Sequence, residues 1–170
     1  MKKIATSSAL LGIALFLAVH TQAQLKLKQY WLAGSVLFAS GLMDGTIESI
    51  NYHYEDGFKL RFPKARDHFW NPAVSWKNKY KNQDPAQGPK FKGSTNVFVF
   101  TTDAYHLLRA TSRTLNGFTL AFYINQSARE KQLSNKQRWL RIGRDFLVLT
   151  AIRTAGFHLT YSVLFRKGGL

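Results

Sequence analysis

Apolar segments of this chain carry ionisable side chains at helical spacing. Asp44 and Glu48 lie four residues apart in one segment, and further along Asp103 and His106 lie three apart. Side chains at these spacings share one face of a helix, where carboxylate and imidazole groups can bind a divalent metal, relay protons or form ion pairs. Where the helices meet, we expect one buried polar cluster, made of Asp44, Glu48, Asp103, His106, Arg109, Arg153 and His158.

The arginines of this cluster allow two interpretations. Arg109 and Arg153 can neutralise the carboxylates, so that the cluster only fixes how the helices pack. Together with Arg113, the same guanidinium groups can instead receive the phosphate or carboxylate of a lipid headgroup. A proton relay through the histidines and aspartates is a third interpretation. None of the three requires a cofactor.

A divalent metal is the fourth interpretation. An Asp-x-x-His pair on a helix directs two ligands the same way, which makes Asp103 and His106 candidate metal ligands and candidate catalytic residues. Glu48 and His158 would complete a set of carboxylate and imidazole ligands. A metal held there would activate water, so the corresponding function is a metal-dependent membrane hydrolase acting on a lipid or another envelope substrate.

Composition excludes several other kinds of site. The 170 residues fit one domain and include no cysteine, which rules out disulfides, thiolate zinc sites, cysteine nucleophiles and iron–sulfur clusters. The chain contains no glycine-rich phosphate-binding loop before a helix and no Gly-x-Ser-x-Gly nucleophile motif. An enzymatic activity is therefore neither predicted nor excluded.

Helices are expected to position these side chains. Three apolar segments approach the length of membrane spans, approximately residues 30–50, 94–110 and 142–165. In the first, Gly41 and Gly45 form a small-xxx-small spacing that allows a neighbouring helix to approach closely in lipid. The predicted fold is all-α, a small membrane bundle of about three helices. Because charged residues interrupt every segment, a soluble periplasmic helical domain is the alternative.

The N-terminus has the pattern of a secretory signal peptide. Lys2 and Lys3 precede an apolar stretch over residues 4–19, and cleavage is expected after Ala23. Residues 24–170 would then form a single helical membrane domain. Export argues against nucleic acid as a partner. The excess of 24 Lys and Arg over 9 Asp and Glu instead predicts contact with anionic membrane lipids.

Residues 53–93 are expected to form a long loop, because they contain all four prolines, and they also contain nine Lys or Arg residues. Ser94, just after it, is expected to cap the second long helix. Aromatic and basic side chains in the loop suit a membrane surface, where rings settle at headgroup depth and lysines reach toward phosphates. These interface residues are Trp70, Trp76, Lys77, Lys79, Tyr80 and Lys81. Packing of the tryptophans against the bundle is the alternative.

Several motifs stand out between residues 44 and 109. Among them are Phe69-Trp70-Asn71-Pro72, Ser75-Trp76-Lys77-Asn78-Lys79-Tyr80-Lys81 and Thr101-Thr102-Asp103-Ala104-Tyr105-His106. In these motifs the chain resembles a family of uncharacterised bacterial polytopic membrane proteins. The resemblance implies a helical membrane protein and brings no reaction, substrate or cofactor with it.

These observations predict an integral membrane protein of the bacterial cell envelope, located in the inner membrane. The expected function is that of a structural or anionic-lipid-interacting helical bundle with a buried polar cluster. Membrane lipids are the expected partners. A second copy of the chain or another membrane protein is a further candidate partner.

Overall fold

Three long helices dominate the computed structural model, which describes residues 27–128 and 133–167. They are α2 (Leu27–Tyr52), α6 (Ala104–Ala128) and α7 (Asn135–His158), and the short π-helix η6 (Leu159–Leu164) continues α7. The described residues contain no β-strand, so the predicted all-α fold is confirmed. The predicted signal peptide lies outside the described residues.

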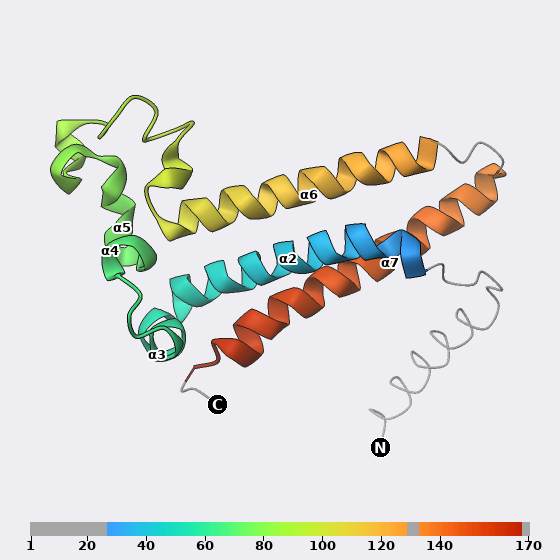
Figure 1. The fold of residues 1–170 in the computed structure, drawn as a ribbon, viewed down its shortest axis with the longest axis horizontal. Coiled ribbons are helices and arrows are strands. Elements are labelled where there is room, and N and C mark those ends of the chain that lie inside the picture. The colour runs from blue at the N-terminus through green and yellow to red at the C-terminus, as the bar shows by residue number, and fades with distance from the viewer. Residues whose placement is uncertain (1–26, 129–132, 168–170) are drawn as a thin grey trace, which may run out of the picture.

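Helix α2 is the central element of the bundle (Figure 1). It packs against α6 on one side and α7 on the other, whereas α6 and α7 contact each other little. Helix α6 runs antiparallel to α2, and α7 runs parallel to it. Two helices that share a neighbour but barely touch leave a groove between them, and the structure contains such a groove between α6 and α7.

Glycines set the close crossing of α2 and α7. A Cβ atom at Gly41 would lie 2.1 Å from the backbone oxygen of Arg153, and one at Gly156 would lie 2.3 Å from the backbone oxygen of Phe38. A Cβ atom at Gly45 would also meet the backbone of α7, at 2.4 Å. The two helix backbones are therefore in direct contact, and α7 is the neighbour that uses the small-xxx-small spacing of α2.

Residues 53–103 form a cap on one end of the bundle (Figure 1). Its short helical elements are η1 (Tyr54–Phe58), α3 (Lys59–Arg61), α4 (Asp67–Trp70), α5 (Pro72–Ser75), η2 (Trp76–Lys79), η3 (Lys81–Gln83), η4 (Pro85–Gln87) and η5 (Val99–Thr101). A cluster of buried side chains, Ile50, Tyr54, Phe58 and Phe165, joins the cap to α2 and η6. The segment expected to be a long loop is thus a packed series of short helical turns.

The second long helix begins later than predicted. Helix α6 starts at Ala104 rather than near residue 94, because Asp103 is its N-cap and accepts a hydrogen bond from the His106 N–H at 2.9 Å. Ser94, the expected cap, instead donates its hydroxyl to the Lys79 carbonyl at 2.7 Å within the cap. The apolar residues before Asp103 belong to turns of the cap, so the predicted span over 94–110 is wrong in its placement.

Helix α7 begins earlier than predicted. Ser134 caps it and accepts a hydrogen bond from the Gln137 N–H, while the Gln137 side chain accepts one from the Ser134 N–H. This reciprocal capping box satisfies two backbone donors that a helix start otherwise leaves unpaired. The helix therefore includes a basic turn before the apolar segment that starts near residue 142.

Candidate functional site

The residues predicted to form one polar cluster lie in separate places. Among the residues that the structure describes, no three His, Asp or Glu side chains are grouped closely enough to hold a metal ion. The predicted ligand set, Glu48, Asp103, His106 and His158, is therefore not brought together. The expectation of a single cluster is corrected to one ion pair, one hydrogen-bonded pair of an aspartate and a histidine, and side chains that join neither pair.

The ion pair lies inside the bundle. The Arg153 guanidinium of α7 donates to the Asp44 carboxylate of α2, and the Ser112 hydroxyl of α6 donates to the same carboxylate at 2.8 Å. The Ser40 hydroxyl donates to the Asn116 amide oxygen at 2.8 Å and lies 3.0 Å from the Ser112 hydroxyl. Each long helix contributes to this network, which satisfies the Asp44 charge and fixes the register of the three helices.

The second pair lies at the start of α6. Asp103 is 1% exposed and accepts hydrogen bonds from the His106 backbone and from the Thr102 hydroxyl, the latter at 3.0 Å. The ring Nδ1 of His106 lies 2.8 Å from the nearer carboxylate oxygen, so it also donates to Asp103. The Asp-x-x-His spacing that suggested a metal site is thus explained by capping of a helix.

Three predicted members of the cluster stand apart from both pairs. Arg109 is exposed and stacks on Tyr105, with its guanidinium carbon 5.5 Å from the ring centroid. His158 is exposed because Gly156 faces α2, and a residue two positions later points to the far side of a helix. Glu48 is half-buried on α2 and joins neither pair. The prediction that Arg109 and His158 are buried is therefore wrong.

Asp145, which the sequence pattern did not single out, is the centre of another polar group. It is 2% exposed, and the hydroxyls of Tyr30 in α2 and Tyr123 in α6 both donate to it. Arg144 donates to it at 2.9 Å and Arg141 at 3.5 Å. We call these five residues the Asp145 group, and it joins the three helices at the end opposite the cap. The spacing of Arg141 and Asp145, four residues apart on one helix face, is the sequence signal that could have found it.

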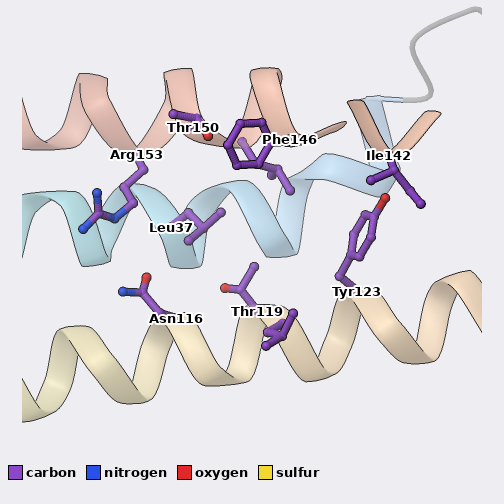
Figure 2. A pocket seen from close by; sticks show the side chains of 10 residues that line it. Leu37, Asn116, Thr119, Tyr123, Ile142, Phe146, Thr150 and Arg153 are labelled. Atoms are coloured by element: carbon purple, nitrogen blue, oxygen red, sulfur yellow. The ribbon is translucent and has the colours of Figure 1, made fainter. Parts of the chain in front are cut away.

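A groove of about 350 Å³ opens between α6 and α7 (Figure 2). Most of its lining is apolar and comes from all three helices, namely Leu37, Leu120, Ile142, Phe146 and Leu149. Arg153 and Asn116 lie at one end of the groove, and Tyr123 lies at the other. The groove therefore connects the ion pair inside the bundle to the Asp145 group.

The predicted interface residues divide into a packed part and an exposed part. Trp70 stacks on Phe58, with ring centroids 5.2 Å apart, so it lies against the cluster that joins the cap to the bundle. Trp76 is 40% exposed, with the Lys77 ammonium 5.7 Å from its ring centroid. Beside them are Tyr80, which meets Trp76 edge-on, together with Lys79 and the exposed Lys81.

The cap contains a titratable group formed by Tyr54, Lys59 and Asp67. Hydrogen bonds from Lys59 and then Tyr54 hold the pKa of the exposed Asp67 carboxyl below its usual range. Burial, with Asp67 as a second cause, raises the pKa of the Tyr54 phenol above its ordinary value. Since the folded pKa of Asp67 is lowered, its contribution to stability is present above its ordinary pKa of about 3.9 and is lost as the pH falls through the lowered value.

We therefore expect acid to loosen the cap less in Asp67→Asn than in the wild type. The variant lacks the titrating carboxylate, so its cap is already weakened at neutral pH and changes little more on acidification below about pH 4. Tryptophan fluorescence reports this change, because Trp70 packs on the cap cluster. Identical acid titrations of the two proteins would contradict the role given to Asp67.

Asp103→Ala is expected to destabilise the protein by about 1–2 kcal/mol, because it removes an N-cap. Asp103→Ser retains a hydroxyl that can accept from the backbone, so it should recover most of this loss. Thermal unfolding of the purified protein measures both variants. If the serine variant is as unstable as the alanine variant, capping does not explain the position of Asp103.

Comparisons of the chain with protein-family models, with curated proteins and with solved structures found no match. No family is therefore assigned to it.

Proposed function

We propose that this chain is an integral membrane protein whose three long helices form a lipid-embedded bundle that associates with anionic phospholipid. One observation carries the proposal. Compared with a protein folded in water, the bundle has its polar and apolar side chains in reversed places, with small and polar residues inside and large apolar residues outside. In water, apolar side chains gather inside and polar ones outside. In lipid, helices associate through small residues and hydrogen bonds, and their outer faces are apolar.

Inside the bundle, small and polar residues predominate at the helix contacts. They include Ser40, Gly41, Gly45, Ser112, Thr119, Asp145, Gly156 and Thr160. On the outside lie large apolar side chains, among them Trp31, Phe118, Leu120, Ile124, Trp139, Leu140, Phe146 and Leu147. The cluster of buried aromatic residues lies at the cap rather than between the long helices. This pattern leaves extensive apolar surface that water would penalise and lipid would accept.

The lengths of the three helices, and the hydropathy of one of them, agree with this proposal. By length and composition, one described helical stretch, Asn135–Leu164, is long and apolar enough to cross a membrane. In α2 and α6, Asp44 and Ser112 lie where these two helices contact each other, whereas Arg109 and Arg113 are exposed on α6, and both kinds of residue lower the mean hydropathy of these helices. Residues 30–50, 104–123 and 145–164 each give about 30 Å of helix, which equals the thickness of a hydrocarbon core.

Polar and aromatic groups lie at both ends of these 30 Å segments. The Asp145 group and the exposed Trp31 and Trp139 mark one end. Asp103 and the buried cluster that joins the cap to the bundle mark the other end. Tyrosine and tryptophan favour the boundary between hydrocarbon and headgroups, where lysine and arginine can contact lipid phosphates. The 24 Lys and Arg of the chain suit a membrane rich in anionic lipid, as at the bacterial inner membrane.

Extraction of membranes from expressing cells tests the proposal. We expect the protein to stay in the pellet after an alkaline carbonate wash and to enter the detergent phase in a neutral-pH phase separation. The neutral measurement is needed because alkali can unfold the cap. Burial raises the pKa of the Tyr54 phenol, so the cap favours the neutral phenol and loses this stabilisation as the pH rises. Release into the aqueous phase in both measurements would show that the bundle is not embedded in lipid.

A further inference from the structure

We infer that residues 71–102 of the cap form a lobe that docks on the anionic phospholipid headgroups surrounding the bundle. We call this segment the basic lobe. In the docked arrangement its lysines bind lipid phosphates, and its exposed turn at residues 97–100 enters the outer part of the hydrocarbon. The inference rests on the proposed membrane location and adds to it a lipid-binding surface whose strength depends on the charge of the lipid.

The basic lobe is a folded unit rather than an open loop. The Lys90 N–H and the Ser94 hydroxyl both donate to the Lys79 carbonyl, at 2.9 and 2.7 Å. The Asn78 amide donates to the Thr102 carbonyl at 3.1 Å, which joins the first half of the lobe to its end. Because the backbone is already ordered by these bonds, docking costs little further conformational entropy.

Positive charge is concentrated in the basic lobe. It contains five lysines and one acidic residue, Asp84, so its net charge is +4. Residues 53–70 of the cap contain four basic and three acidic residues, so their net charge is only +1. In the part of the chain that the structure describes, no carboxylate pairs with a lysine of the lobe. These lysines are therefore available to an anionic surface, and they are Lys77, Lys79, Lys81, Lys90 and Lys92.

Two parts of the lobe differ in their chemistry. The turn at residues 82–88 contains Asp84 but no lysine and no large apolar residue. Residues 90–100 instead combine two lysines with four exposed apolar side chains, Phe91, Val97, Phe98 and Phe100. Exposed aromatic and basic side chains in one segment suit headgroup depth, where rings enter the boundary with the hydrocarbon and lysines reach phosphates. Residues 90–100 therefore face the membrane, and the turn at residues 82–88 faces water.

The lobe lies where the proposed bundle leaves the hydrocarbon. Helix η5 of the lobe ends just before Asp103, the N-cap of α6, and both η5 and α5 contact α6. Figure 1 shows the lobe beside the start of α6. A span that starts at residue 104 places the turn at residues 97–100 at the boundary between hydrocarbon and headgroups. An acidic protein would also attract the lysines, but it would not account for apolar side chains exposed at this depth.

The first test varies the lipid. The full-length chain carries a nitroxide at Val97→Cys, because Val97 is 70% exposed, and it is reconstituted into phosphatidylcholine vesicles with or without phosphatidylglycerol. A neutral nickel complex reports contact with water without responding to surface charge. We expect the label to be protected from nickel in vesicles with phosphatidylglycerol. It should become accessible in phosphatidylcholine alone, or at about 1 M salt, where the Debye length is about 3 Å. A label at Ala86→Cys should stay accessible throughout.

The second test removes charge from the lobe. The variant K90Q/K92Q lacks two of its exposed lysines, and the matched control K64Q/R66Q lowers the charge equally at exposed sites of the cap outside the lobe. Each lysine near an anionic surface contributes about fivefold to binding, so K90Q/K92Q should lower the ratio of docked to undocked label by about 25-fold. The control should keep the ratio of the wild type. Because all four side chains are exposed, both variants should unfold at the temperature of the wild type.

Three results would overturn the inference. They are nickel access to position 97 in vesicles with phosphatidylglycerol, equal protection with and without phosphatidylglycerol, and equal effects of the two double variants. Protection of position 97 in detergent without phospholipid, increasing with protein concentration, would assign the lobe to contact with a second copy and would also overturn it.

A label at Phe118→Cys on α6 separates the failure of this inference from the failure of the proposed function. If the label at position 118 stays in lipid while any of these results occurs, the docked lobe fails and the proposed membrane location stands. If nickel relaxes the label at position 118 as well, the proposed function itself fails.

Discussion

Gly41→Ala is expected to lower the free energy of unfolding by about 3 kcal/mol, the upper end of the usual cost of adding atoms to a tightly packed contact. The added Cβ would lie 2.1 Å from the Arg153 backbone oxygen and 2.9 Å from the Phe157 backbone nitrogen. Backbone atoms cannot turn away as a flexible side chain can, so α2 and α7 must separate. Such a separation would also strain the hydrogen bond from the Thr160 hydroxyl to the Leu42 carbonyl at 3.2 Å.

Gly117 and Gly143 provide matched controls for this substitution. They lie in α6 and α7, and an added Cβ at either position would meet no atom within 4 Å. Alanine there should leave the stability unchanged or raise it by up to about 1 kcal/mol, since alanine favours a helix more than glycine does. Thermal unfolding in detergent compares the three variants. If Gly41→Ala melts at the same temperature as the controls, the close crossing of α2 and α7 is not essential to the fold.

Asp44→Asn is expected to destabilise the protein by about 3 kcal/mol, the cost of leaving Arg153 unpaired within the hydrocarbon. The double variant D44N/R153Q should recover much of this loss, because it leaves no charge in the bundle. The size of the effect depends on the surroundings. The Arg153 side chain is 43% exposed, so an unpaired guanidinium would be hydrated if the bundle were in water, and the pair would contribute less than about 1 kcal/mol.

Unfolding measurements on the wild type, Asp44→Asn, Arg153→Gln and the double variant give the coupling energy between Asp44 and Arg153. A coupling near 3 kcal/mol agrees with an ion pair shielded from water. A coupling near zero would show that water reaches Arg153 from the groove, which would contradict the proposed environment.

The sequence predicts the long helices better than their starting points. The first segment predicts α2 closely, because its apolar residues extend over the length of a span and Asp44 and Glu48 are the only charged residues among them. The second segment was misplaced because Val97, Phe98, Val99 and Phe100 are apolar but lie in turns of the cap. Val97, Phe98 and Phe100 are exposed on the cap, so hydrophobicity alone does not distinguish these turns from a membrane helix, and only the capping chemistry of Asp103 locates the true start of α6.

The polar groups were predicted only in part, because helical spacing does not tell which face of a helix meets its neighbour. In α7 that face is set by Gly156, which allows close approach to α2. Arg153 lies three residues before Gly156 and reaches Asp44, whereas His158 lies two residues after it and points away. Asp145 was missed because its partners come from three helices, and no local pattern joins Tyr30 to Tyr123.

Nitroxide accessibility tests the membrane location of the bundle most directly. The chain contains no cysteine, so Phe118→Cys on α6, Leu147→Cys on α7 and Ala86→Cys in the cap each provide a single labelling site. In vesicles containing phosphatidylglycerol, the labels at positions 118 and 147 should be relaxed by oxygen and protected from a water-soluble nickel complex, and the label at position 86 should show the reverse. If the nickel complex relaxes all three labels equally, the outer faces of α6 and α7 are in water and the lipid-embedded bundle is contradicted.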